Sequence, residues 1–133
     1  RIPPALRAHP AVLAVEWDLH AHVGDWEAAL HTALRLLEID RSKPDPWIHR
    51  AYALHELGRT AEARDALYPA LTLFPTLGII PYNLACYACQ LGDMDQARIW
   101  LRSAITLDGR TVVLDRARKD RDLIPLRQEM DFL

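Results

Sequence analysis

Residues 44–77 read PDPWIHRAYALHELGRTAEARDALYPALTLFPTL, and this stretch decides the fold. Its apolar side chains recur at intervals of three and four residues as far as Leu57, which is the pattern of an amphipathic helix. Gly58 then supplies the left-handed residue that ends such a helix, and a second helical pattern runs from there to Leu73. The stretch therefore predicts two helices joined by a tight turn.

The same arrangement occurs three times along the chain. Gly24, Gly58 and Gly92 are 34 residues apart, and each of them follows a hydrophobic residue. An alanine lies five residues after each glycine, and an aliphatic residue lies fifteen residues after it. Self-similarity at a fixed period is typical of repeat proteins. The sequence therefore predicts an array of helical pairs.

Local signals place the ends of these helices. The first helices of the three pairs are expected at 12–23, 47–57 and 81–91. The second helices are expected to end at Ile39, Leu73 and Leu107. Asp25 and Asp93 stand where a second helix needs an N-cap. Pro69 cannot donate to the carbonyl of Asp65, so a bend or a lost hydrogen bond is expected within its helix. No segment alternates in the manner of a strand, so the predicted fold class is all-α.

The middle unit resembles the tetratricopeptide repeat, a helix–turn–helix unit of 34 residues. It has the family's signature residues at Trp47, Ala51, Leu54, Gly58, Ala63, Leu67, Ala70 and Pro75. The third unit matches at Leu84, Ala85, Gly92, Ala97, Leu101 and Ala104. The resemblance implies a single domain over residues 1–133, a right-handed superhelix (solenoid) of three repeats at 10–43, 44–77 and 78–111, and a C-terminal capping helix within 112–133.

The two ends of the array differ from its middle. In the first unit Trp17 stands where the family has a small residue, and Ala33 stands where it has a large one. We interpret this unit as an N-terminal cap, because terminal repeats are often atypical; the alternative is that Trp17 packs against preceding repeats. In the capping segment, Leu123, Leu126 and Phe132 are expected to cover the last apolar face.

Composition excludes several classes of function. The 133 residues include 16 Lys and Arg against 18 Asp and Glu, a formal charge of −2, and the chain therefore lacks the basic surface expected of a nucleic-acid-binding protein. No apolar run approaches the roughly 20 residues of a membrane-spanning helix. Two cysteines without other signs of a disulfide framework favour a reducing, cytoplasmic location.

The resemblance also implies which side chains face a groove for a partner. In this family the groove is lined by the first helix of each unit, and the matching polar or aromatic positions form the candidate partner-binding site. They are Asp18, His22, His49, Tyr52, His55, Glu56, Tyr82, Asn83, Cys86, Cys89 and Gln90. Asn83 stands out because an amide side chain can both donate to and accept from a peptide unit. Some family members bind a C-terminal carboxylate with lysine, arginine and asparagine, and the matching positions here are Ala14, Asp18, His49, Ile79 and Asn83. Only Asn83 fits, and Asp18 has the wrong charge, so that function is not expected.

Catalytic and metal-binding patterns are not found. Cys86 and Cys89 form a C-x-x-C motif, but it lies within a helix rather than at the N-terminus that lowers a thiol pKa. A zinc site needs about four ligands, and no second pair follows. The sequence contains no phosphate-binding loop, nucleophile elbow or H-E-x-x-H helix. We therefore expect no enzyme activity, no metal and no cofactor.

The predicted function is that of an adaptor or scaffold that binds a peptide segment of another protein in its groove. Three alternatives remain open. The first is self-assembly through the ends of the array, where an uncovered Trp17 or Phe132 would pair with another copy. The second is a chaperone for a secreted client. The third is an adaptor that links a cytoskeletal element or a membrane, as kinesin light chains do with longer repeats.

Overall fold

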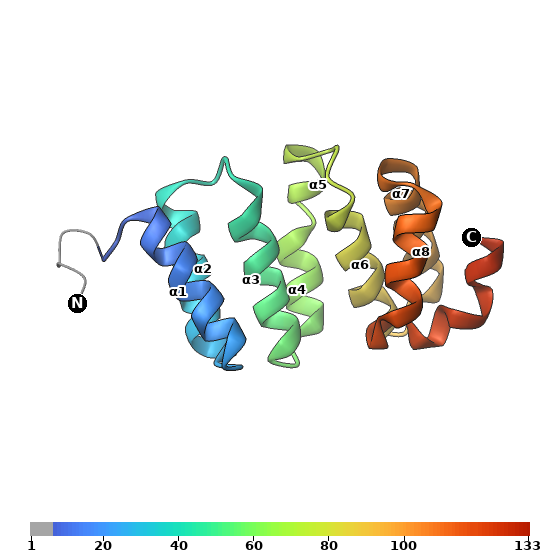
Figure 1. Ribbon diagram of the computed structural model, residues 1–133, viewed down its shortest axis with the longest axis horizontal. Coiled ribbons are helices and arrows are strands. Elements are labelled where there is room, and N and C mark those ends of the chain that lie inside the picture. Colours follow the sequence, from blue (N-terminus) through green and yellow to red (C-terminus); the bar gives the residue numbers. More distant parts are fainter. Residues whose placement is uncertain (1–6) are drawn as a thin grey trace. The chain divides into compact units, whose positions relative to one another are not determined.

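The computed structural model describes residues 7–133, so residues 1–6 of the predicted domain lie outside the described part. Within that part every regular element is helical, in agreement with the predicted all-α class. The elements are α1 (Pro10–His22), α2 (Trp26–Ile39), α3 (Pro44–Glu56), α4 (Thr60–Leu67), α5 (Ala70–Leu73), α6 (Ile79–Gln90), α7 (Met94–Asp108), α8 (Arg110–Lys119) and η2 (Arg121–Phe132) (Figure 1).

The local signals of the sequence explain most of these boundaries. Gly24, Gly58 and Gly92 have φ angles of +76°, +79° and +82° and end the first helix of each pair, as predicted. Asp25 Oδ1 accepts a hydrogen bond from the amide of Ala28 at 3.2 Å, and Asp93 Oδ1 accepts one from Gln96 at the same distance. Both carboxylates thus cap the N-termini of α2 and α7.

The first helices begin two or three residues earlier than predicted. Pro10 and Pro44 are the first residues of α1 and α3. A proline fits this position because its missing N–H would have no partner there and its φ angle is already helical. The apolar pattern of α1 and α3 begins only after these prolines. The helix starts predicted from that pattern therefore lie two or three residues beyond the observed ones.

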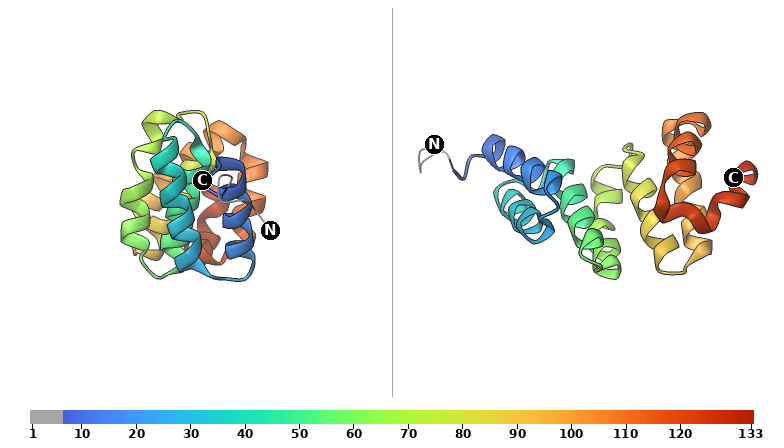
Figure 2. Two further views of the ribbon diagram at one scale, coloured as in Figure 1. Left: turned by 90° about the vertical axis from the view of Figure 1, so that its left-hand side faces the viewer. Right: turned by 60° about the horizontal axis from the view of Figure 1, so that its bottom comes forward.

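The chain divides into two compact units, Arg1–Ala66 and Leu67–Leu133. In the first unit α2 packs against both α1 and α3, and in the second unit α6 and α7 form an antiparallel pair (Figure 2). The small residues that the repeat places between paired helices are fully buried, among them Ala29, Ala51, Ala85 and Ala97. A larger side chain at such a position would overpack the contact.

The second helix of the middle repeat is interrupted at Pro69, where the sequence predicts a bend or a lost hydrogen bond. α4 ends at Leu67, Tyr68 and Pro69 form a turn, and α5 begins at Ala70. The interruption follows directly from proline's missing amide hydrogen. It lies next to the boundary between the two compact units, which falls after Ala66.

The C-terminal segment contains two elements rather than the single capping helix that was predicted. α8 is followed by η2, a succession of 3₁₀ turns that begins after Asp120. Leu123 and Leu126 are fully buried, as expected, but Phe132 is 86% exposed. The prediction that Phe132 covers the last apolar face is therefore wrong, and Met130 is the buried residue near the end of the chain. Among residues 7–133, no helix combines the length and apolar character needed to cross a bilayer.

Candidate functional site

An aromatic cluster joins helices α1, α2 and α3 of the first unit. The rings of Trp17 in α1 and His49 in α3 are stacked, with centroids 3.9 Å apart and an interplanar angle of 11°. Trp26, the first residue of α2, contacts Trp17 at 6.4 Å and packs edge-on against Tyr52 of α3 at 5.4 Å. We call these four residues the aromatic cluster. It brings together two predicted site residues, His49 and Tyr52.

Polar side chains continue from the aromatic cluster along α3. Asp45, His49, Tyr52 and Glu56 follow one another at intervals of three and four residues, and therefore lie on one face of the helix. Asp45, Tyr52 and Glu56 are exposed, while His49 is half-buried. Three of the four predicted residues of α3, His49, Tyr52 and Glu56, thus form one stripe with Asp45, which was not predicted.

Helix α1 contributes a second polar stripe to the same unit. Asp18 and His22 are four residues apart, so they lie on one face of α1, and both are exposed. Asp18 follows Trp17, whose ring stacks on His49. Its negative charge raises the pKa of His49, which is consistent with a position close to the aromatic cluster. We use the term α1–α3 face for Asp18, His22, Asp45, His49, Tyr52 and Glu56.

His55 has a local structural contact. Its Nδ1 lies 2.9 Å from the hydroxyl oxygen of Thr60, the first residue of α4, and the side chain is half-buried. The contact joins the end of α3 to the start of α4. His55 therefore contributes less open surface than its predicted role in a groove would require.

Burial dominates the electrostatics of His49. The loss of hydration lowers the pKa of its imidazole, and the charges of Asp45 and Asp18 only partly oppose this effect. Its Nδ1 is buried without a hydrogen-bond partner among the described residues, as is Nε1 of Trp17. The neutral imidazole is thus the form that suits the stack, because charging it would leave a poorly solvated cation.

In the second unit, the predicted site residues of α6 lie beneath the C-terminal segment. Tyr82 donates a hydrogen bond to Asp120 Oδ2 at 2.8 Å, and the Cys86 thiol lies 3.6 Å from the same oxygen. The side-chain amide of Gln90 donates to the carbonyl of Asp122 at 2.9 Å. Tyr82, Cys86 and Cys89 are all buried. These three side chains are accessible to a partner only if the segment that follows α8 moves away.

Asp120 is the centre of this contact. Besides the groups of Tyr82 and Cys86, its carboxylate accepts the amide of Asp122 at 3.0 Å. Cys86, Asp120 and Asp122 offer ligand atoms within 4.8 Å of one another. Three donors already satisfy the Asp120 carboxylate, and burial raises the pKa of the Cys86 thiol, which disfavours a metal-binding thiolate. We therefore interpret the group as a hydrogen-bonded cluster.

Two further predicted residues of α6 have different surroundings. Asn83 is half-buried, and Gln90 is exposed although its amide is bonded to the chain beyond α8. Cys86 and Cys89 are free thiols. Of the predicted site residues in this unit, Asn83 alone is neither buried nor hydrogen-bonded to the C-terminal segment in the described structure.

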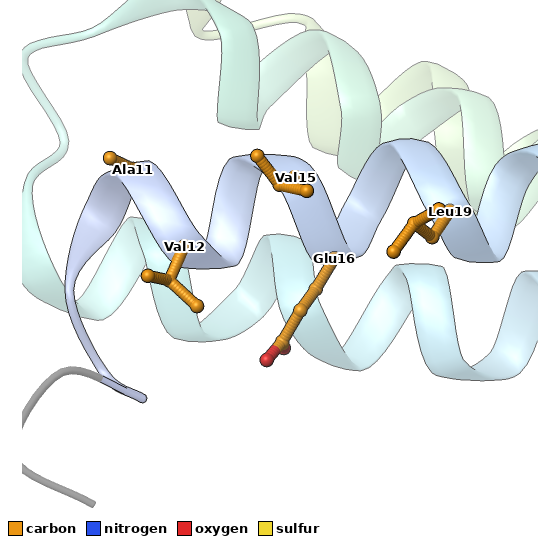
Figure 3. A pocket seen from close by; sticks show the side chains of 5 residues that line it. All are labelled: Ala11, Val12, Val15, Glu16 and Leu19. Atoms are coloured by element: carbon orange, nitrogen blue, oxygen red, sulfur yellow. The ribbon is translucent and has the colours of Figure 1, made fainter. Parts of the chain in front are cut away.

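An apolar stripe on α1 was not predicted as a site. Ala11, Val12, Val15, Glu16 and Leu19 line a shallow depression (Figure 3). Val15 is 57% and Leu19 is 61% exposed, whereas Trp17 is buried. The expectation that Trp17 lies uncovered at the end of the array is therefore wrong. Apolar residues lie around most of the circumference of α1, so they cannot all face the core. This pattern in the sequence could have predicted that some of them are exposed.

Sequence reasoning also missed Trp26 and Asp120. Trp26 lies outside the first helices, to which the family's groove positions are confined, and its contact with Tyr52 follows only from packing. Asp120 lies 38 residues after Tyr82, and no local pattern links the two. The 34-residue period stops before Asp120, so the repeat could not predict its position.

The comparisons with known proteins agree with the repeat architecture. A family model described as tetratricopeptide repeat matches residues 82–111. MamA of strain MSR-1 is similar in structure, with a TM-score of 0.69 and 25% sequence identity over 78% of this chain and 60% of MamA. The chain thus spans about three fifths of that relative. No curated protein sequence matches the chain.

Two other solved structures have the same fold at lower identity. The first tetratricopeptide domain of Spaghetti (RPAP3), bound to an HSP90 peptide, has a TM-score of 0.74 and 14% identity, covering 92% of this chain and 90% of that domain. PcrH from Pseudomonas aeruginosa has a TM-score of 0.72 and 17% identity, covering 99% and 91%. PcrH is also known in complex with the chaperone-binding region of PopD.

The burial of His49 predicts that the chain loses stability in mild acid. Because the folded state lowers the pKa of His49, the unfolded chain binds a proton more readily, so the free energy of unfolding should fall as pH decreases below about 6.5. The slope attributable to one group is at most about 1.4 kcal/mol per pH unit. His49→Phe keeps a ring for the stack but cannot titrate, so urea denaturation between pH 5 and 7.5 should show a flatter profile.

The matched control for this experiment is His31→Gln, since His31 is exposed on α2. The control should keep the pH profile of the unaltered chain. Equal slopes for His49→Phe and the unaltered chain would show that the imidazole of His49 is not the group responsible.

The contacts of Asp120 predict that the C-terminal segment shields both cysteines. The thiols should react slowly with a thiol reagent at pH 7.5, because both are buried and burial raises the pKa of each. Asp120→Ala removes the acceptor for Tyr82 and Cys86. A loss of about 1–2 kcal/mol in local stability would speed labelling by about 5–30-fold.

Asp115→Ala is the control, because Asp115 is an exposed carboxylate of α8 with no ion pair in the described structure. Its labelling rate should equal that of the unaltered chain. Rapid labelling before any substitution, or equal rates for the two variants, would contradict the shielding.

Proposed function

We propose that this chain, which has the fold of tetratricopeptide-repeat proteins, is a non-enzymatic adaptor that binds an extended segment of another protein on the α1–α3 face. The observation that carries the proposal is the contrast between the two units. The α1–α3 face presents exposed aromatic and charged side chains, whereas most of the corresponding residues of α6 are buried or bonded to the chain's own C-terminal segment.

The chemistry of the α1–α3 face suits peptide recognition. Tyr52 offers a large, partly exposed ring that the edge-on contact with Trp26 holds in place. An aromatic anchor of this kind loses little conformational entropy on binding. Asp18, His22 and Glu56 surround it with groups that form hydrogen bonds with a backbone or side chains. Similar proteins hold peptides: RPAP3 binds an HSP90 peptide and PcrH the chaperone-binding region of PopD.

The cellular setting belongs to the same proposal. Two free, buried thiols suit a reducing compartment, and we place the adaptor in the cytoplasm. An extended segment is also what a chaperone for a secreted client would hold, so that alternative uses the same surface. The two roles differ in the client, which a chaperone binds before export and an adaptor binds in its mature state.

Selection from a library of random dodecapeptides displayed on phage tests the proposal. The 133-residue chain should enrich related sequences, and a fluorescein-labelled member should bind in solution. Tyr52→Ala should weaken this binding about tenfold or more, because exposed aromatic anchors dominate interfaces of this type.

Tyr68→Ala is the matched control. Tyr68 is 44% exposed against 39% for Tyr52, and it packs edge-on against Trp100 as Tyr52 does against Trp26. The control should bind the peptide as the unaltered chain does. No enrichment in the selection, or equal losses for the two variants, would contradict the α1–α3 face as the binding site.

The apolar stripe of α1 favours a second function, the association of two copies of this chain. In an antiparallel pairing of two α1 helices about Val15, Ala11 of one copy lies opposite Leu19 of the other, so that a small side chain faces a large one. The stripe is self-complementary in this sense, and a two-fold interface requires such a surface.

Mass measured by light scattering against concentration tests this second function. The unaltered chain should approach twice its monomer mass as concentration rises, and Leu19→Glu should remain a monomer. Leu34→Glu, at a leucine of α2 that is 40% exposed, is the control and should still associate. A monomer at every concentration would exclude the pairing.

A further inference from the structure

The α1–α3 face carries negative charges that nothing in the described structure neutralises. Asp18, Asp45 and Glu56 are exposed, and none of them forms an ion pair in the described part of the chain. Two other carboxylates of the same unit are paired: Glu62 contacts Arg59, and Asp65 contacts Arg64. The difference leaves the acidic groups of this face available to a positively charged partner.

Two arginines of the first unit have contacts with Trp47. α1 contains no Lys or Arg, and α3 contains only Arg50. The guanidinium of Arg50 donates to the carbonyl of Ala66 at 2.9 Å and lies over the ring of Trp47, 5.1 Å from its centroid. Arg41 lies over the same ring at 5.8 Å. Both arginines thus lie over Trp47, and neither forms an ion pair with Asp18, Asp45 or Glu56 in the described structure.

The imidazole of His49 does not supply a positive charge to the α1–α3 face. Burial against Trp17 lowers the pKa of His49, which therefore stays neutral at physiological pH. Tyr52 adds an exposed ring whose π electrons attract cations. Glu56 lies one turn after Tyr52 on the same face of α3, and Asp18 lies beside the aromatic cluster on α1. An exposed ring with one carboxylate a turn away on α3, and a second on α1 whose charge acts on His49, is a favourable setting for an ammonium or guanidinium group.

We infer that the segment bound at the α1–α3 face carries a Lys or Arg side chain, whose cation lies over the ring of Tyr52 between Asp18 and Glu56. This inference rests on the proposed function and specifies the partner chemistry. The aliphatic stem of the basic residue packs on the aromatic cluster while its charged end meets the carboxylates. The same charges repel an acidic segment, so the face discriminates by charge as well as by shape.

The composition of the phage-selected peptides tests the inference. The unaltered chain should enrich Lys or Arg at one recurrent position next to an apolar residue. In a selected peptide, replacing that basic residue by Gln should weaken binding about tenfold, and replacing it by Glu should weaken it further. Raising NaCl from 0.05 to 0.5 M should weaken the basic peptide and leave the Gln version nearly unchanged.

Reversing charges on the protein is a second test of the inference. The double variant Asp18→Lys with Glu56→Lys should shift the preference from Lys toward Glu in the same peptide. The control, Glu38→Lys with Asp115→Lys, changes the net charge equally at exposed positions of α2 and α8 and should keep the preference for Lys. The isosteric pair Asp18→Asn with Glu56→Gln checks the result with little risk to folding, and should reduce the preference for Lys over Gln.

The outcomes separate the two proposals. Enriched peptides without a basic excess, equal binding of the Lys and Gln versions, or the same shift in the reversal and control variants would overturn the inference and leave peptide binding intact. A selection that enriches nothing would overturn the proposed function itself, and the inference with it.

Discussion

The close approach of paired helices is the constraint on which this structure depends. Ala29, Ala51, Ala85 and Ala97 are fully buried where two helices meet, and their small side chains allow the backbones to pack at short range. Glycines with positive φ angles end each first helix, so that the second helix of the pair can pack back against it. Leu54, Leu84 and Leu101 then fill the space on either side as core residues. Small residues at a fixed interval and buried leucines between them account for the fold of each unit.

The two units use the same architecture with different consequences for their surfaces. In the first unit the stacking of Trp17 on His49 fills the space between α1 and α3, and the polar residues beside it stay exposed. In the second unit η2 and the end of α8 cover the corresponding side chains of α6. Arg98 of α7 holds η2 in place, since its guanidinium donates two hydrogen bonds to the carboxylate of Glu129 at 2.7 and 3.0 Å. Paired helices of one architecture can therefore leave their polar residues exposed, as in the first unit, or pack them under the segment that follows α8, as in the second.

The sequence predicts the fold because its decisive signals are local. The spacing of Gly24, Gly58 and Gly92, the caps Asp25 and Asp93, and the break at Pro69 each act within a few residues, and the structure confirms them. The candidate site was less predictable. The family's pattern indicates which face of a helix a residue occupies, but Tyr82 and Cys86 are covered by a segment that lies beyond the repeats. Trp17 was misjudged for a similar reason, because its burial depends on His49, 32 positions later in the chain.

The turn at Tyr68 and Pro69 has a mechanical consequence. A continuous helix resists bending because every turn is tied to the next by main-chain hydrogen bonds, and proline removes one of these ties. The helix that would otherwise run from Thr60 to Leu73 is thereby divided into two shorter helices, α4 and α5, with a turn between them. Pro69 has no amide hydrogen to bond the carbonyl of Asp65. Bending the chain at Tyr68 and Pro69 therefore breaks no hydrogen bond to that carbonyl.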